Sequence, residues 1–122
     1  HGPDKITSNE YTKTTVSPGV VSYHNGTEIV MIDIAAGTSG NVYARTYQYK
    51  DGTLIFSFWD GPEYYPDHRL YFDNNILFRW RFTHEAADPI NYDNTIADGE
   101  YIGWETSALE EGLWVLSQAN GA

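Results

Sequence analysis

The sequence predicts an α+β fold that is mostly β: a single antiparallel sheet of about six or seven strands in meander order, with one C-terminal helix packed on one face. Short β-rich runs follow one another up to residue 83, separated by turn residues such as Asn-Gly, Asp-Gly and Asp-Asn-Asn. From residue 99 the apolar residues recur every three or four positions, which is the period of a helix. The 122 residues suit one domain, expected at residues 10–122 after a loose segment at 1–9.

The expected strands are bounded by Gly, Pro, Asn and Asp. A Thr-rich run at 10–16 is compatible with an edge strand and ends at Pro18-Gly19. Asn25-Gly26 separates the next two runs and predicts a type I′ hairpin turn, because both central residues of that turn need φ > 0. The other strands are expected at 20–24, 27–35, 42–49, 54–59, 69–72 and 76–83, and the helix at about 99–118.

The length of the last hairpin loop decides which side chains share a face. A two-residue loop at 74–75 would oppose Leu70 with Arg79 and place an arginine among core residues. A three-residue loop at 73–75 opposes Leu70 with Phe78 instead, and we therefore prefer it.

The hairpin at residues 50–52 leaves two registers open. A three-residue loop opposes Tyr47 with Ile55, and a two-residue loop, which fits nearly as well, buries Tyr47 against Phe56. With three-residue loops, one face is a core face and comprises Leu54, Phe56, Phe58, Leu70, Phe72, Phe78, Trp80 and Phe82. The other face is amphipathic and comprises Tyr43, Arg45, Tyr47, Tyr49, Trp59, Arg69, Tyr71, Arg79 and Arg81. Because one helix covers one face, we expect function on this second, open face.

Charge and composition exclude several classes of protein. The net charge of −10 argues against binding nucleic acid or anionic lipid, both of which need Lys and Arg. No apolar run reaches the roughly 18 residues of a spanning helix, so no membrane insertion is expected. Cys is absent, which removes disulfides, thiolate metal sites and Cys nucleophiles. The chain opens without Met, and we expect a mature fragment or an excised domain.

The charges are also unevenly distributed along the chain. Residues 1–81 hold nine acids and all seven bases, whereas residues 82–122 hold eight acids and no base. One explanation is pairing between the basic sheet and the acidic helix.

Two aromatic hairpin runs carry a resemblance. They read Tyr-Lys-Asp-Gly-Thr-Leu-Ile-Phe-Ser-Phe and His-Arg-Leu-Tyr-Phe-Asp-Asn-Asn-Ile-Leu-Phe-Arg-Trp. This pattern resembles uncharacterised aromatic-rich β-hairpin modules of bacterial secreted or membrane-anchored surface proteins, best over residues 47–83 and loosely over 91–116. The resemblance implies an extracellular or cell-surface β-rich domain, and it assigns no functional residue.

Exposed aromatics next to polar groups indicate a carbohydrate ligand. Trp and Tyr rings stack on the C–H faces of sugars, and nearby carboxylates and arginines bond the hydroxyls. The loop from Trp59 to Pro66 combines three aromatics with two acids, and it lies beside the Tyr/Arg face. The candidate ligand-binding residues are Trp59, Asp60, Glu63, Tyr64, Tyr65, Tyr43, Tyr47, Tyr71, Arg69, Arg79 and Arg81. In the alternative interpretation, the loop tyrosines only cover the edge of the core.

The open face would also carry a pair of like charges. The preferred register opposes Arg69 with Arg79, which is unfavourable unless an acid neutralises them. Glu63 or Glu85 of this chain is the favoured partner, and an acidic sugar or an acidic patch of another protein is the other candidate.

Metal and catalytic motifs are weak or missing. Oxygen ligands crowd residues 88–100, so structural calcium is a minor candidate at Asp88, Asp93 and Asp98, although the spacing does not match a calcium loop. No other cofactor is expected. No nucleophile-elbow, phosphate-loop or dinucleotide motif is present.

These observations predict a non-catalytic extracellular binding module whose partner is a polysaccharide or glycan. The alternative is a protein-interaction or structural domain of a larger bacterial surface protein, docked on a neighbouring domain. A small hydrolase acting on sugars is the third hypothesis; it needs only a pair of Asp or Glu carboxyls, so the abundance of acidic residues is no evidence for it.

Overall fold

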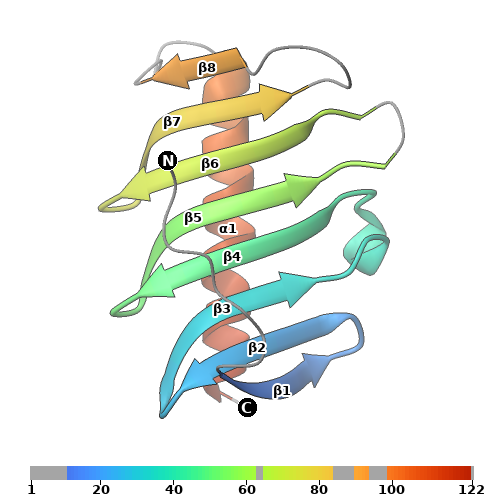
Figure 1. Cartoon of the computed structure of the whole chain (residues 1–122), viewed down its shortest axis with the longest axis vertical. Helices are drawn as coiled ribbons and strands as arrows, with labels where there is room; N and C mark the ends of the chain where they lie inside the picture. Colours follow the sequence, from blue (N-terminus) through green and yellow to red (C-terminus); the bar gives the residue numbers. More distant parts are fainter. Residues whose placement is uncertain (1–10, 63–64, 84–89, 94–98, 122) are drawn as a thin grey trace.

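Successive strands of the sheet pair only with their sequence neighbours, in the order β1 to β8 (Figure 1). The structure is a computed structural model that describes residues 11–62, 65–83, 90–93 and 99–121. Its strands are β1 (Thr12–Ser17), β2 (Val20–Asn25), β3 (Glu28–Ile34), β4 (Ala44–Lys50), β5 (Thr53–Asp60), β6 (Asp67–Asp73), β7 (Ile76–Thr83) and β8 (Ile90–Asp93). The helix α1 (Gly99–Gly121) crosses one face of the sheet, and a 3-10 turn η1 (Thr38–Gly40) precedes β4. The predicted fold class is confirmed.

The short β8 is the element that the sequence did not indicate. It lies between residue 83, where the expected strands end, and residue 99, where the expected helix begins. The predicted loose segment at residues 1–9 lies outside the described residues.

Three hairpins share one construction, a two-residue loop followed by a bulge. The loops at Asp51-Gly52 and Asn74-Asn75 have positive φ at both residues, as type I′ turns require. In the first hairpin Asn25 pairs with Glu28, so the loop residues are Gly26 and Thr27, and the predicted turn at Asn25-Gly26 is wrong by one residue.

The bulges explain why the predicted three-residue loops are wrong. Each bulge adds one unpaired residue to the second strand of its hairpin, at Val30, Ile55 and Phe78. The added residue shifts the pairing beyond it by one position. In the last hairpin Leu70 therefore opposes Trp80 instead of Arg79, and no arginine enters the core. A short loop therefore keeps the arginines out of the core without the third loop residue that we had predicted.

The bulges also exchange residues between the faces, because a shift of one residue moves a side chain across the sheet. Tyr43, Arg45, Tyr47, Tyr49 and Trp59 lie on the face that α1 covers, and their predicted place on the open face is wrong. Phe56, Phe58 and Phe78 lie on the open face, and their predicted place in the core is wrong. The predicted core positions Leu54, Leu70, Phe72, Trp80 and Phe82 are confirmed, as are Arg69, Tyr71, Arg79 and Arg81 on the open face.

A buried ion pair attaches α1 to the centre of the sheet. The side chain of Arg45 is fully buried, and its Nε and Nη2 donate to the two carboxylate oxygens of Glu111 at 2.8 and 2.7 Å. Tyr47 donates to the same carboxylate at 2.7 Å, and Tyr49 donates to the carbonyl of Gly112 at 2.6 Å. The predicted pairing of a basic sheet with an acidic helix is confirmed for Arg45 and Glu111.

A second attachment lies at the last hairpin. The backbone N–H of Leu77 donates to Glu105 Oε2 at 2.8 Å, and its carbonyl accepts from Tyr101 Oη at 2.7 Å. Two helix side chains thus satisfy both backbone groups of the residue that precedes the bulge at Phe78.

Candidate functional site: an aromatic cleft

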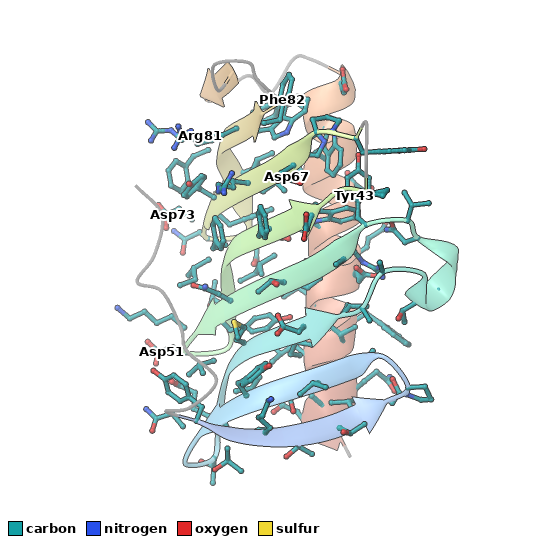
Figure 2. All side chains as sticks on the ribbon, turned by 45° about the vertical axis from the view of Figure 1, so that its right-hand side comes forward. Tyr43, Asp51, Asp67, Asp73, Arg81 and Phe82 are labelled. Carbon is teal, nitrogen blue, oxygen red and sulfur yellow. The ribbon has the colours of Figure 1, made fainter. Side chains whose placement is uncertain are left out.

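Four aromatic side chains from separate segments meet at one end of the sheet. Tyr43 precedes β4, Trp59 lies near the end of β5, Tyr65 belongs to the loop that follows, and Trp104 lies in the first half of α1. We call this group, with the α1 residues Glu100, Gly103 and Ser107, the aromatic cleft. Figure 2 shows Tyr43 and Asp67 at this end, away from the hairpin turns that carry Asp51 and Asp73.

Tyr43 lies at the centre of the four rings. The ring of Tyr43 meets those of Trp59, Tyr65 and Trp104 edge to face, with centroids 5.6 to 5.9 Å apart and interplanar angles of 66 to 88°. Trp59 and Trp104 meet each other at 84° with centroids 5.0 Å apart. The rings therefore form walls at steep angles to one another, and they do not form a flat row.

The cleft opens to solvent beside the helix. Trp59, Glu100, Gly103, Trp104 and Ser107 line a cavity of about 290 Å³, which is close to the lower size of ligand pockets. Gly103 lies in this lining and faces open space, since a Cβ at that position would have no atom within 4 Å. Glu100 and Ser107 are exposed polar residues of the lining.

The walls are held in place by contacts behind them. Trp59 is only 6% exposed, and its Nε1 donates to Ser57 Oγ at 2.9 Å. The ring of His68 stacks on Trp104 with centroids 3.9 Å apart. Trp80 Nε1 donates to His68 Nδ1 at 2.9 Å, so neutral His68 carries its proton on Nε2.

The loop that carries Tyr65 is tight. A Cβ on Gly61 would lie 2.7 Å from Tyr65 Cβ and 2.9 Å from the Tyr65 carbonyl oxygen, so this position requires glycine. The Gly61 amide donates to Asp67 Oδ1 at 3.0 Å, and the Tyr65 amide donates to the Pro62 carbonyl at 2.9 Å. The loop thereby presents Tyr65, which is 50% exposed, against the ring of Tyr43.

Two carboxyl groups lie at the base of this loop. Burial raises the pKa of Asp60, and the charge of Asp67 and the hydrogen bond that protonated Asp60 donates to Asp67 raise it further. Burial, with Tyr65 and Asp67 nearby, also raises the pKa of the Tyr43 phenol. Direct contact between the two carboxyls does not fit two-carboxylate glycoside hydrolysis, in which they stand about 5 Å or more apart around the sugar.

The structure brings together part of the predicted ligand-binding set. Trp59 lines the opening, Tyr43 packs on Trp59 with Tyr65 beside it, and Asp60 lies at the base of the Tyr65 loop. Tyr47 is fully buried beneath α1. The other described members, Arg69, Tyr71, Arg79 and Arg81, lie on the opposite face of the sheet. Glu63 and Tyr64 lie outside the described residues.

The helix supplies the cleft residues that the sequence did not indicate, namely Glu100, Gly103, Trp104 and Ser107. Trp104 follows the apolar period of the helix, which by itself indicates packing on the sheet and not that the same ring also lines an opening. The available signal was Gly103 itself, because glycine inside a helix costs about 1 kcal/mol relative to alanine and calls for a reason.

The described residues also bear on the predicted calcium site and on membrane insertion. The predicted calcium candidates Asp88 and Asp98 lie outside the described residues, and of Asp93 only the backbone is described. Within the described residues, no group of three or more His, Asp or Glu side chains could hold a metal ion. No helix among them has both the length and the apolar character needed to cross a membrane.

Comparisons with protein-family models, with curated proteins and with solved structures found no match to this chain. The resemblance to modules of bacterial surface proteins therefore stays a prediction.

Proposed function

We propose that this chain is a non-catalytic binding module that acts outside the cell or at its surface and binds carbohydrate in the aromatic cleft. One observation carries the proposal: Trp59 and Trp104 line an opening that Gly103 leaves unfilled, and the ring of Tyr43 packs on both of them with Tyr65 beside it. This site replaces the flat sheet surface that the sequence predicted.

The chemistry of the cleft suits a single sugar ring. Aromatic walls offer π faces and edges to the C–H groups of a pyranose, while Glu100 and Ser107 offer oxygen atoms to its hydroxyls. The two aromatic walls of the opening, Trp59 and Trp104, meet at 84°, which suits one ring better than a long flat chain. We therefore expect the cleft to bind one unit of a glycan.

The acidic residues around the cleft disfavour a negatively charged sugar. Glu100 lines the opening, and Asp60 and Asp67 lie at the base of the Tyr65 loop. A uronic acid would bring a further negative charge to this group, which costs free energy. Neutral sugars are thus the expected ligands.

The test is a glycan array followed by polysaccharide affinity measurements, with and without calcium. Wild-type protein should bind a neutral glycan, and Tyr65→Ala should weaken binding about tenfold, which corresponds to about 1.4 kcal/mol. Trp114→Ala is the control, because Trp114 is 61% exposed but lies outside the cleft. Failure to bind any glycan, or equal losses in both variants, would contradict the proposal.

A second candidate function, a protein-interaction domain, is favoured by a different groove. Val16, Val20, Trp114 and Val115 line a hollow of about 500 Å³ between the edge strand β1 and the C-terminal half of α1. An extended segment of a neighbouring domain could pair with β1 and place an apolar side chain against Trp114. In that case Trp114→Ala, and not Tyr65→Ala, would weaken binding of the partner.

A further inference from the structure

Two arginines stand side by side on the face of the sheet that α1 leaves open. Arg69 on β6 pairs directly with Arg81 on β7, and Phe58 on β5 pairs with Arg69. Neighbouring strands lie about 4.8 Å apart, so the side chains of Arg69 and Arg81 leave the backbone at adjacent positions on the same face. We call Phe58, Arg69 and Arg81 the arginine ladder; in Figure 2 Arg81 points away from α1.

The arginine ladder has no internal counter-charge among the described residues. The guanidinium of Arg69 lies 4.8 Å from the centroid of the Phe58 ring, and neither arginine forms an ion pair there. The Nε of Arg81 is buried without a hydrogen-bond acceptor. Arg45 differs sharply, because Glu111 neutralises it with two hydrogen bonds.

The acid that is nearest along the strand is already engaged. Asp67 lies two residues before Arg69 and therefore on the same face. Its Oδ1 accepts from the Gly61 amide, and its carboxyl shares a hydrogen bond with Asp60. Asp67 thus holds the loop of the aromatic cleft and does not neutralise Arg69.

Such a pair is unfavourable by itself. Like charges directly opposed on two strands destabilise a sheet, and a buried donor without an acceptor costs further free energy. Arginine cannot lose its proton to relieve this repulsion. A bound anion would remove both costs, since it supplies negative charge and acceptor atoms together.

We infer that the arginine ladder binds a tetrahedral oxyanion, the chemistry shared by phosphate and sulfate groups. One guanidinium fork already uses both oxygens of a carboxylate, as Glu111 shows with Arg45. A phosphate or sulfate has further oxygens and can accept from two forks on adjacent strands. This inference is independent of the carbohydrate proposal, because the arginine ladder and the aromatic cleft lie on different faces of the sheet.

The test follows the arginine Nε–Hε signals by NMR during titration with inorganic phosphate, inorganic sulfate or acetate at constant ionic strength. Phosphate and sulfate should shift the Arg69 and Arg81 signals with saturation, and acetate should bind at least tenfold more weakly. Glucose 6-phosphate and glucose 6-sulfate identify the source. If they bind as well as the free anions, the natural group is an ester, and if they are excluded, it is a free anion.

Two variants and a matched control complete the test. Arg69→Met and Arg81→Met keep most of the apolar stem, and each should weaken phosphate binding at least tenfold. Lys13→Met removes the same charge from the open face at β1 and should change the affinity less than twofold. If Arg81→Met fails to fold, Arg69→Met carries the comparison. Acetate binding as tight as phosphate binding, or an equal loss in Lys13→Met, would overturn the inference.

Discussion

At the scale of single residues, Arg45 and Glu111 are the pair on which the position of α1 depends. The Arg45 side chain is fully buried, and every hydrogen bond that it makes is to Glu111 or to a backbone carbonyl. A buried charge that loses its partner is costly, whereas an apolar replacement of both partners is tolerated.

Glu111→Ala should therefore lower the free energy of unfolding by about 3 kcal/mol or more, because it leaves Arg45 buried and unpaired. Urea unfolding followed by far-UV circular dichroism measures this change. The double variant Arg45→Met/Glu111→Leu should recover most of the loss. A double variant less stable than Glu111→Ala would show that the ion pair is itself strongly stabilising and that our explanation is wrong.

The carboxyl pair of Asp60 and Asp67 predicts a pH-dependent effect. The folded-state pKa of Asp60 is raised, so this group favours the folded state below its unfolded pKa, and that contribution is lost as pH rises through the folded pKa. Asp60→Asn should therefore be more stable than wild type at neutral pH, by about 0.5 kcal/mol at most at this exposed site. The difference should vanish near pH 3 in thermal unfolding curves. A difference that grows on acidification would contradict this assignment.

At the scale of elements, two glycines of α1 differ in their surroundings: Gly112 lies against the sheet and Gly103 faces open space. A Cβ on Gly112 would lie 2.9 Å from Cδ1 of the fully buried Tyr47, whereas one on Gly103 would have no atom within 4 Å. Close approach of α1 to the sheet thus depends on Gly112, while Gly103 faces the open cleft.

Gly112→Ala should destabilise the protein although alanine is the better helix former, because the Tyr47 ring has no free space to move into. Gly103→Ala should raise the free energy of unfolding by about 0.5–1 kcal/mol through helix propensity. Chemical denaturation of both variants tests the pair. Stabilisation by Gly112→Ala would show that α1 does not approach the sheet as closely as described.

The hairpins show which part of the fold could be predicted from sequence and which could not. The turns at Asp51-Gly52 and Asn74-Asn75 lie where the turn residues indicated. The faces were wrong for Trp59 and Phe78, because a two-residue loop with a bulge and a three-residue loop leave nearly the same local pattern. The sequence favours the three-residue loop because a two-residue loop without a bulge would place Arg79 opposite Leu70, among core residues.

Burial of Arg45 could not be predicted locally either. Its partner Glu111 is 66 residues away in the sequence, and only the folded arrangement of helix on sheet brings them together. The same holds for the aromatic cleft, whose Trp104 and Trp59 come from different halves of the chain. Periodicity identifies elements, whereas a site made between elements depends on their packing.

At the scale of the whole molecule, the fold divides the charge and the candidate functions between two faces. The face under α1 holds the core, the Arg45–Glu111 pair and, at its end, the aromatic cleft. The other face holds the arginine ladder, so a protein with net charge −10 still presents a local pair of cations. A carbohydrate site and an anion site can therefore be occupied without sharing a residue.

The central claim is that the aromatic cleft binds a sugar, and Gly103→Leu tests it most directly. Leucine is a good helix former, and its side chain would extend into the cavity that Gly103 leaves open. The measurement is the affinity for the glycan identified by the array, taken together with the free energy of unfolding. We predict that Gly103→Leu abolishes glycan binding while the fold stays at least as stable as wild type. Undiminished glycan binding by this stable variant would contradict the claim.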